Sequence, residues 1–167
     1  GVTGQDTERE RLLALLMGQG IDTEGVLVDV NRPTTTKTRV VGNHQQMLRI
    51  DAERMGSIGA VLADRLLREI EPRLADSDAV VLSDYAKGVL TGDLCARLIA
   101  AAKAHRLPVL VDPKGQSFQR YAGATLITPN RAELAVASGV DGDDLDALLQ
   151  AAVGMREQLG LEQLMLT

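Results

Sequence analysis

Three short stretches of this sequence place acidic and basic side chains directly after apolar runs that are typical of buried strands. The chemically capable residues are Asp84 and Lys87 after the first run, Asp112 and Lys114 after the second, and Asn130 and Glu133 after the third. Carboxylates can bind Mg²⁺ or a sugar hydroxyl, and fixed ammonium groups can bind phosphates. Together these residue types favour a site for a phosphorylated ligand and a divalent cation.

The elements that must position these residues follow a regular alternation after Gly59. Apolar runs such as "AVVL", "PVLV" and "ATLI" are separated by amphipathic stretches with helical spacing. This alternation predicts an α/β fold whose mostly parallel sheet is covered by helices on both faces. Ligands of such sheets bind beyond the carboxyl ends of the strands. The three stretches are therefore expected at one edge of the sheet. Unrelated surface loops would not all place acids and lysines on the same edge, so this co-location favours a site.

Each stretch also has a simpler interpretation when it is taken alone. Asn130 and Glu133 have the spacing of a capping box, in which each side chain accepts a hydrogen bond from the other residue's N–H. Asp84 could cap the turn that follows it, and an aspartate before a proline, as at Asp112, commonly opens a turn. The lysines could be solvated. A capping box remains compatible with ligand binding, because a capped helix start presents polarised N–H groups beside a carboxylate.

Residues 33–51 interrupt the alternation with the pattern of an exposed hairpin. The runs 35–41 and 46–50 are β-prone and are joined at Gly42 and Asn43, a typical turn pair. The first arm is rich in threonine, lysine and arginine, which indicates an exposed ribbon rather than a core strand.

Composition narrows the class of protein. The chain has 167 residues and is 45% hydrophobic, enough for one domain with a substantial core. Its net charge of -5 and its 2% aromatic content argue against a nucleic-acid or anionic-membrane partner. Cys95 is the single cysteine, which rules out an internal disulfide and favours a reducing compartment. Because transmembrane and signal patterns are also missing, we expect a soluble, cytoplasmic protein.

The motifs "VVLSDYAKGVL", "PVLVDPKG" and "RYAGATLITPNRAEL" follow one another at characteristic distances. They closely resemble the kinase domain of the bifunctional heptose 7-phosphate kinase/heptose 1-phosphate adenylyltransferase family, a branch of the ribokinase-like sugar kinases. "TKTRVVGNHQQMLRID" and the opening "GVTGQD" resemble further segments of these kinases. The resemblance covers nearly the whole chain and implies a ribokinase-like fold with a small hairpin lid.

The resemblance implies an ATP- and Mg²⁺-dependent transfer of phosphate to the anomeric hydroxyl of D-glycero-D-manno-heptose 7-phosphate. The product would be the 1,7-bisphosphate, on the way to ADP-heptose for lipopolysaccharide. In the family, the Asn-x-x-Glu stretch belongs to the ATP site and helps to organise Mg²⁺. The residues expected around ATP are Asn130, Arg131, Ala132 and Glu133 from that stretch, with Glu133 as the candidate metal ligand, and Lys87, Asp112 and Lys114 from the same sheet edge.

On the substrate side, the resemblance assigns residues 33–51 to a lid that closes over the sugar and pairs between subunits. We therefore expect a homodimer through this hairpin. Lys37 and Arg39 could face the phosphate that the sugar already carries, and Asp84 is a candidate for contact with the substrate.

The sequence departs from the family pattern at both ends. An early Gly-Gly-x-x-x-N stretch and a late Gly-Ala-Gly-Asp stretch, whose aspartate is the family's general base, are absent, and so is the adenylyltransferase half. Residues 1–167 are therefore expected to form a partial kinase domain, with the catalytic aspartate beyond Thr167 and no turnover by the chain alone. Two alternatives stay open: another ribokinase-like sugar kinase, and a non-catalytic α/β module that binds a nucleotide or phosphosugar.

Overall fold

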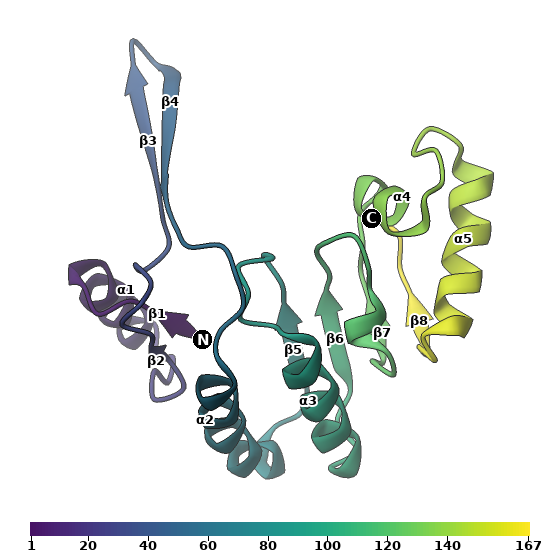
Figure 1. Ribbon diagram of the computed structural model, residues 1–167, viewed down its shortest axis with the longest axis horizontal. Coiled ribbons are helices and arrows are strands. Elements are labelled where there is room, and N and C mark those ends of the chain that lie inside the picture. The colour runs from purple at the N-terminus through teal and green to yellow at the C-terminus, as the bar shows by residue number, and fades with distance from the viewer.

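The computed structural model describes residues 1–167 (Figure 1). Its strands are β1 (Val2–Thr3), β2 (Leu27–Val28), β3 (Thr36–Gly42), β4 (Gln45–Ala52), β5 (Val80–Ser83), β6 (Val109–Asp112), β7 (Leu126–Ile127) and β8 (Gln163–Leu164). Its α-helices are α1 (Thr7–Gly18), α2 (Ala60–Ile70), α3 (Gly92–Ala104), α4 (Arg131–Ser138) and α5 (Leu145–Gln158), and two 3₁₀ helices are η1 (Glu71–Asp76) and η2 (Gln119–Tyr121). No helix combines the length and the apolar character needed to cross a membrane.

The main sheet has the strand order β5-β6-β7-β8, and all its neighbouring strands are parallel. Ser83 pairs with Asp112, so the carboxyl ends of β5 and β6 lie side by side. The expected α/β fold with a parallel sheet is confirmed. The pair β1-β2 is also parallel but forms a separate two-stranded sheet.

The core fixes where this sheet edge stands. Leu82, Val111 and Ile127 on neighbouring strands are at most 4% exposed and belong to one cluster with the apolar faces of α2 and α3. Burying one such side chain contributes roughly 1.5–3 kcal/mol. On the other side of β5, Val81 is 68% exposed. A smaller cluster joins α4 to α5 through Leu134, which anchors the helix that follows β7.

The strands β3 and β4 form a hairpin that stands out from the rest of the molecule (Figure 1). Its turn residues are Asn43 and His44, with φ of 47° and 62°, one residue later than the sequence pattern indicated. The reason is the register: Gly42 pairs with Gln45 and is therefore a strand residue. Two left-handed residues match the twist of a two-residue hairpin, and asparagine tolerates that conformation well.

The two faces of the hairpin differ in character, because residues directly opposite each other share a face. The cross-strand pairs Lys37–Asp51 and Arg39–Arg49 make one face charged. The pairs Thr38–Ile50 and Val40–Leu48 make the other face mainly apolar. Val40, Leu48 and Ile50 are 39%, 48% and 56% exposed, so no part of the chain covers the apolar face.

Candidate functional site

The start of α4 is built as a capping box. The N–H of Glu133 donates to Asn130 Oδ1 at 2.9 Å, and the N–H of Asn130 donates to Glu133 Oε2 at 3.0 Å. Leu134 is fully buried directly behind the cap, so the helix start is fixed in place. The simpler interpretation of the Asn-x-x-Glu spacing is thus confirmed as a structural fact, and it leaves the other carboxylate oxygen of Glu133 for a further contact.

Lys114 supplies that contact from the loop after β6. Its Nζ lies 2.6 Å from Glu133 Oε1. Burial would raise the pKa of Glu133, but the hydrogen bonds from Lys114 and Asn130 outweigh it and the pKa is lowered. The hydrogen bond to Glu133 raises the pKa of Lys114, with a smaller contribution from the charge of Asp112. The pair is therefore fully charged at neutral pH.

A pocket of about 320 Å³ opens at this helix start. Its lining comes from the loop after β6 and from the first turns of α4: Lys114, Gly115, Gln116, Asn130, Ala132, Glu133 and Val136. Four of the residues expected around ATP therefore share one cavity wall. Arg131 turns elsewhere, since its guanidinium donates to the carbonyl of Gly142 at 2.7 Å.

The carboxylate of Asp112 ends β6 in an exposed position. It is close enough to Lys114 to affect that lysine's pKa. No group of three or more His, Cys, Asp or Glu side chains is placed to share a metal ion. Mg²⁺ does not require such a cage, because it usually binds one or two carboxylates together with waters and substrate phosphates. Asp112 and Glu133 are two carboxylates at this edge of the sheet that could bind Mg²⁺ in this way.

The side chain of Asp84 is buried and bonded within the chain. It is only 3% exposed. Oδ1 accepts from the N–H of Ala86 at 2.7 Å, which is the turn-capping contact that the sequence left open. Oδ2 accepts from the hydroxyl of Tyr121 at 2.6 Å and lies 3.5 Å from Arg120 Nη1. Both carboxylate oxygens are therefore engaged within the chain.

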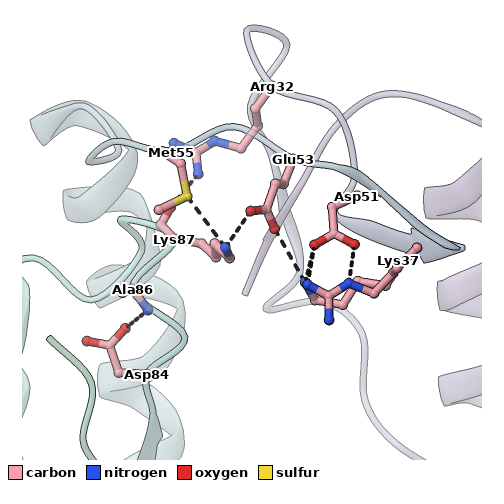
Figure 2. Close-up of polar contacts among 9 residues, drawn as sticks. Arg32, Lys37, Asp51, Glu53, Met55, Asp84, Ala86 and Lys87 are labelled. Atoms are coloured by element: carbon pink, nitrogen blue, oxygen red, sulfur yellow. Dashed lines mark hydrogen bonds and ion pairs between the residues drawn. The ribbon is translucent and has the colours of Figure 1, made fainter. Parts of the chain in front are cut away.

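Lys87 is hydrogen-bonded to the base of the hairpin (Figure 2). Its Nζ donates to Glu53 Oε1 at 2.6 Å, and this hydrogen bond is the main cause of the lowered pKa of Glu53. Lys37 lies 3.0 Å from Asp51 and 3.7 Å from Glu53 Oε2, an oxygen that is buried without a hydrogen-bond partner. Two lysines and two carboxylates thus alternate where the hairpin joins the body.

The backbone also ties the loop after β5 to the hairpin base. Arg32 donates to the carbonyl of Lys87 at 3.2 Å and to that of Gly56 at 3.4 Å (Figure 2 shows Arg32 beside Lys87). Gly88 has a φ of +84°, and a Cβ there would lie 1.9 Å from the carbonyl oxygen of Gly56. Only glycine allows the two backbones to approach this closely.

Arg39 lies further along the charged face of the hairpin and is exposed. Its cross-strand neighbour is Arg49, and like charges directly opposite each other repel. Arg49 is compensated by Asp51 at 2.8 Å, whereas Arg39 has no ion-pair partner in the chain. The arrangement leaves one guanidinium free to bind an anion.

Sequence reasoning missed Tyr121, Arg120 and Glu53. The "RY" pair precedes the third strand end, and Glu53 follows the hairpin, but neither belongs to a spacing with a chemical meaning of its own. The register of Lys37 against Asp51 is the signal that could have pointed to paired charges at the hairpin base. Cys95 is buried in the core with its pKa raised to about 11 by burial, which fits an inert structural thiol.

The profile of the pfkB family of carbohydrate kinases matches residues 1–167, and the chain belongs to this family. Among curated relatives, it is 47% identical over its full length to the "Bifunctional protein HldE" of Methylobacillus flagellatus, covering 34% of that protein. It is 45% identical, again over its full length, to the "D-beta-D-heptose 7-phosphate kinase" of Bordetella bronchiseptica, covering 51% of it. The chain thus spans about a third of the bifunctional relatives and half of the kinase.

Solved structures agree on the fold. Arabidopsis thaliana ribokinase, complexed with ribose and ATP, matches 99% of this chain over 53% of its own, with a TM-score of 0.68 and 18% identity. Escherichia coli phosphofructokinase-2 in complex with fructose-6-phosphate matches 99% of this chain over 54% of its own, with a TM-score of 0.66 and 17% identity. These similarities confirm the ribokinase-like fold.

Proposed function

We propose that the protein containing this chain is an ATP-dependent kinase that phosphorylates D-glycero-D-manno-heptose 7-phosphate at its anomeric hydroxyl. The product is heptose 1,7-bisphosphate, a precursor of ADP-heptose for lipopolysaccharide. The names of the relatives support the choice of heptose 7-phosphate as the substrate. The observation that carries the reaction class is the Lys114–Glu133 pair at the capped start of α4, on the wall of a cavity of about 320 Å³.

ATP binds, in this proposal, with its phosphates at that helix start. Phosphoryl transfer is mostly positioning and neutralisation of charge. Lys114 supplies a fixed positive charge, and the first N–H groups of α4 add the positive end of the helix dipole. When bound, Mg²⁺ would neutralise the charge that develops on the phosphates, and Asp112 and Glu133 are the side chains that would hold it. Arg131 and Ala132 are the first two residues of α4 and contribute through their backbone N–H groups at this helix start.

The sugar phosphate binds, in the same proposal, under the charged face of the hairpin. Arg39, which has no ion-pair partner in the chain, and Lys37 face the phosphate that the substrate already carries. Lys87 belongs to this substrate side, because its ammonium group contacts Glu53 at the hairpin base. The uncovered apolar face, with Val40, Leu48 and Ile50, supports a homodimer in which two hairpins pair.

The test is an assay of ADP release by the full-length protein with Mg²⁺-ATP and heptose 7-phosphate, with fructose 6-phosphate and ribose as comparison substrates. Release of ADP that depends on heptose 7-phosphate, with formation of the 1,7-bisphosphate, is the expected result. Faster release with fructose 6-phosphate or ribose would replace the substrate but keep the sugar-kinase class. Binding of ATP and heptose 7-phosphate in calorimetry without any ADP release would instead favour a non-catalytic binding module.

A further inference from the structure

Tyr121 is a buried titratable residue that the proposed reaction does not use. Its side chain is fully buried at the end of η2, and its ring packs 6.2 Å from that of Phe118. The hydroxyl lies between two strand ends. It donates to Asp84 Oδ2 at 2.6 Å and accepts from the backbone N–H of Lys114 at 3.4 Å, with the carbonyl of Lys114 at 3.3 Å. One oxygen atom therefore bridges the loop after β5 and the loop after β6.

The charge of Asp84 is balanced from the same short helix. Arg120 Nη1 lies 3.5 Å from Asp84 Oδ2, donates to the carbonyl of Leu90 at 3.2 Å, and its guanidinium stands 5.8 Å from the centre of the Tyr121 ring. A buried carboxylate without partners would be costly. Burial, followed by the hydrogen bond to Asp84, raises the pKa of Tyr121, so the phenol keeps the proton that it donates.

The Tyr121 hydroxyl connects the loop after β5, which carries Lys87, to the loop after β6, which carries Lys114. Asp84 begins the loop that leads to Lys87, and its own N–H donates to the carbonyl of Asp112 at 3.0 Å. Lys114 follows two residues after Asp112, and its ammonium group then reaches Glu133. Hydrogen bonds thus connect Asp84 to Tyr121 and Tyr121 to the backbone of Lys114, and the side chain of Lys114 completes the path to Glu133 on α4.

We propose that Tyr121 is a positioning residue of the phosphate site: with Asp84 and Arg120 it fixes the backbone of Lys114, so that the ammonium group meets both Glu133 and the ligand phosphates. This inference rests on the proposed function. The residue works through Lys114 and touches no ligand itself. A tyrosine that served only as core filling would need its ring but not its hydroxyl, and that difference can be measured.

The decisive variant is Tyr121→Phe in the full-length protein, because it keeps the ring and removes the bridging oxygen. We expect KM for ATP to rise about five- to tenfold, the worth of one or two hydrogen bonds. KM for heptose 7-phosphate should rise less, within about twofold, because Arg39 and Lys37 lie on the hairpin and Lys87 is held separately by its hydrogen bond to Glu53. The matched control is Tyr85→Phe, at a tyrosine that is 68% exposed in the loop after β5 and should match the wild type. Unchanged KM for ATP in Tyr121→Phe would overturn the proposal.

A double-mutant cycle separates positioning from general loosening of the fold. If Tyr121 acts through Lys114, adding Tyr121→Phe to Lys114→Met should raise KM for ATP no further than Lys114→Met alone. A full additive rise would contradict the proposal. Hydrogen exchange at the Lys114 amide, which donates to the tyrosine hydroxyl, should be faster in Tyr121→Phe and unchanged in Tyr85→Phe.

Should Tyr121→Phe not fold, Arg120→Gln takes its place, because the Arg120 side chain is 34% exposed and carries less of the core. It should give a smaller rise of about twofold in KM for ATP, with KM for the sugar unchanged. Equal rises for both substrates would count against the proposal. A wild-type protein without ATP-dependent transfer would defeat the proposed function itself, whereas an active wild type matched by both variants defeats only this inference.

Discussion

The two lysine-bearing regions of the sheet edge are built in different ways. Lys114 approaches a helix start that is held by a capping box and by fully buried Leu134. Lys87 approaches the base of a hairpin whose second strand is exposed along its whole length. Fixed backbone and buried support cost no reorganisation when a ligand binds. In the proposed reaction the phosphate-donor side would therefore be preorganised, while the proposed sugar side lies on an exposed hairpin with little buried support.

This comparison agrees with what each half must do in the proposed reaction. Phosphate groups of ATP are stabilised best by donors and charges whose positions are fixed before the reaction. A lid must open to admit a sugar and close to exclude water, and such motions use elements with few buried contacts. The Lys87–Glu53 hydrogen bond and the contact of Gly88 with Gly56 fasten the hairpin only at its base.

The largest expected effect is on the rigid side. Lys114→Met should lower kcat/KM for ATP about 100-fold, because a preorganised charge next to transferring phosphate is lost. Steady-state kinetics with ATP as the varied substrate measures this. Lys103→Met, on the exposed side of α3, is the matched control and should behave as wild type. A loss below about threefold would remove Lys114 from the site.

A smaller effect is expected on the hairpin. Arg39→Ala should raise KM for heptose 7-phosphate about tenfold through loss of one charge-assisted contact, while KM for ATP changes little. Arg11→Ala is the control, since Arg11 is 71% exposed on α1 and pairs with Glu8. An equal rise of KM for ATP would break the division of the edge into a donor side and a sugar side.

The smallest effect concerns stability and pH. Glu133→Gln keeps a capping oxygen but loses the charge that meets Lys114, so we expect it to unfold about 1 kcal/mol more easily at neutral pH. The pKa of Glu133 is lowered in the folded protein, so the charged form stabilises above the unfolded value of about 4.3 and this contribution is lost as pH falls through the folded pKa. The difference in Tm between wild type and variant should therefore shrink on acidification. A gap that widened would mean that Glu133 is not stabilised in its charged form.

Local patterns were enough to predict the parallel sheet, the hairpin and the cap at Asn130 and Glu133, because each depends on residues a few positions apart. The co-location of the three strand ends followed from the geometry of parallel sheets. The side chains that hydrogen-bond to one another around the site could not be predicted from these patterns. Tyr121 meets Asp84 across 37 positions and Lys87 meets Glu53 across 34, and only the folded chain brings them together. The observed hairpin turn lies one residue later than the composition indicated. Cross-strand register, and not turn composition alone, decides which residues are paired and which form the turn.

The close approach of Gly88 to Gly56 has a consequence for how this protein tolerates mutation. Position 88 lies in a loop, and a random library would be expected to accept many residues in a loop. Here every other amino acid would bring a Cβ to within 1.9 Å of a carbonyl oxygen, in a backbone conformation with φ of +84°. In a deep mutational scan, substitutions at Gly88 should therefore be depleted as strongly as those at a catalytic residue. The cause of that depletion would be the close approach of two backbones and not a role in the reaction.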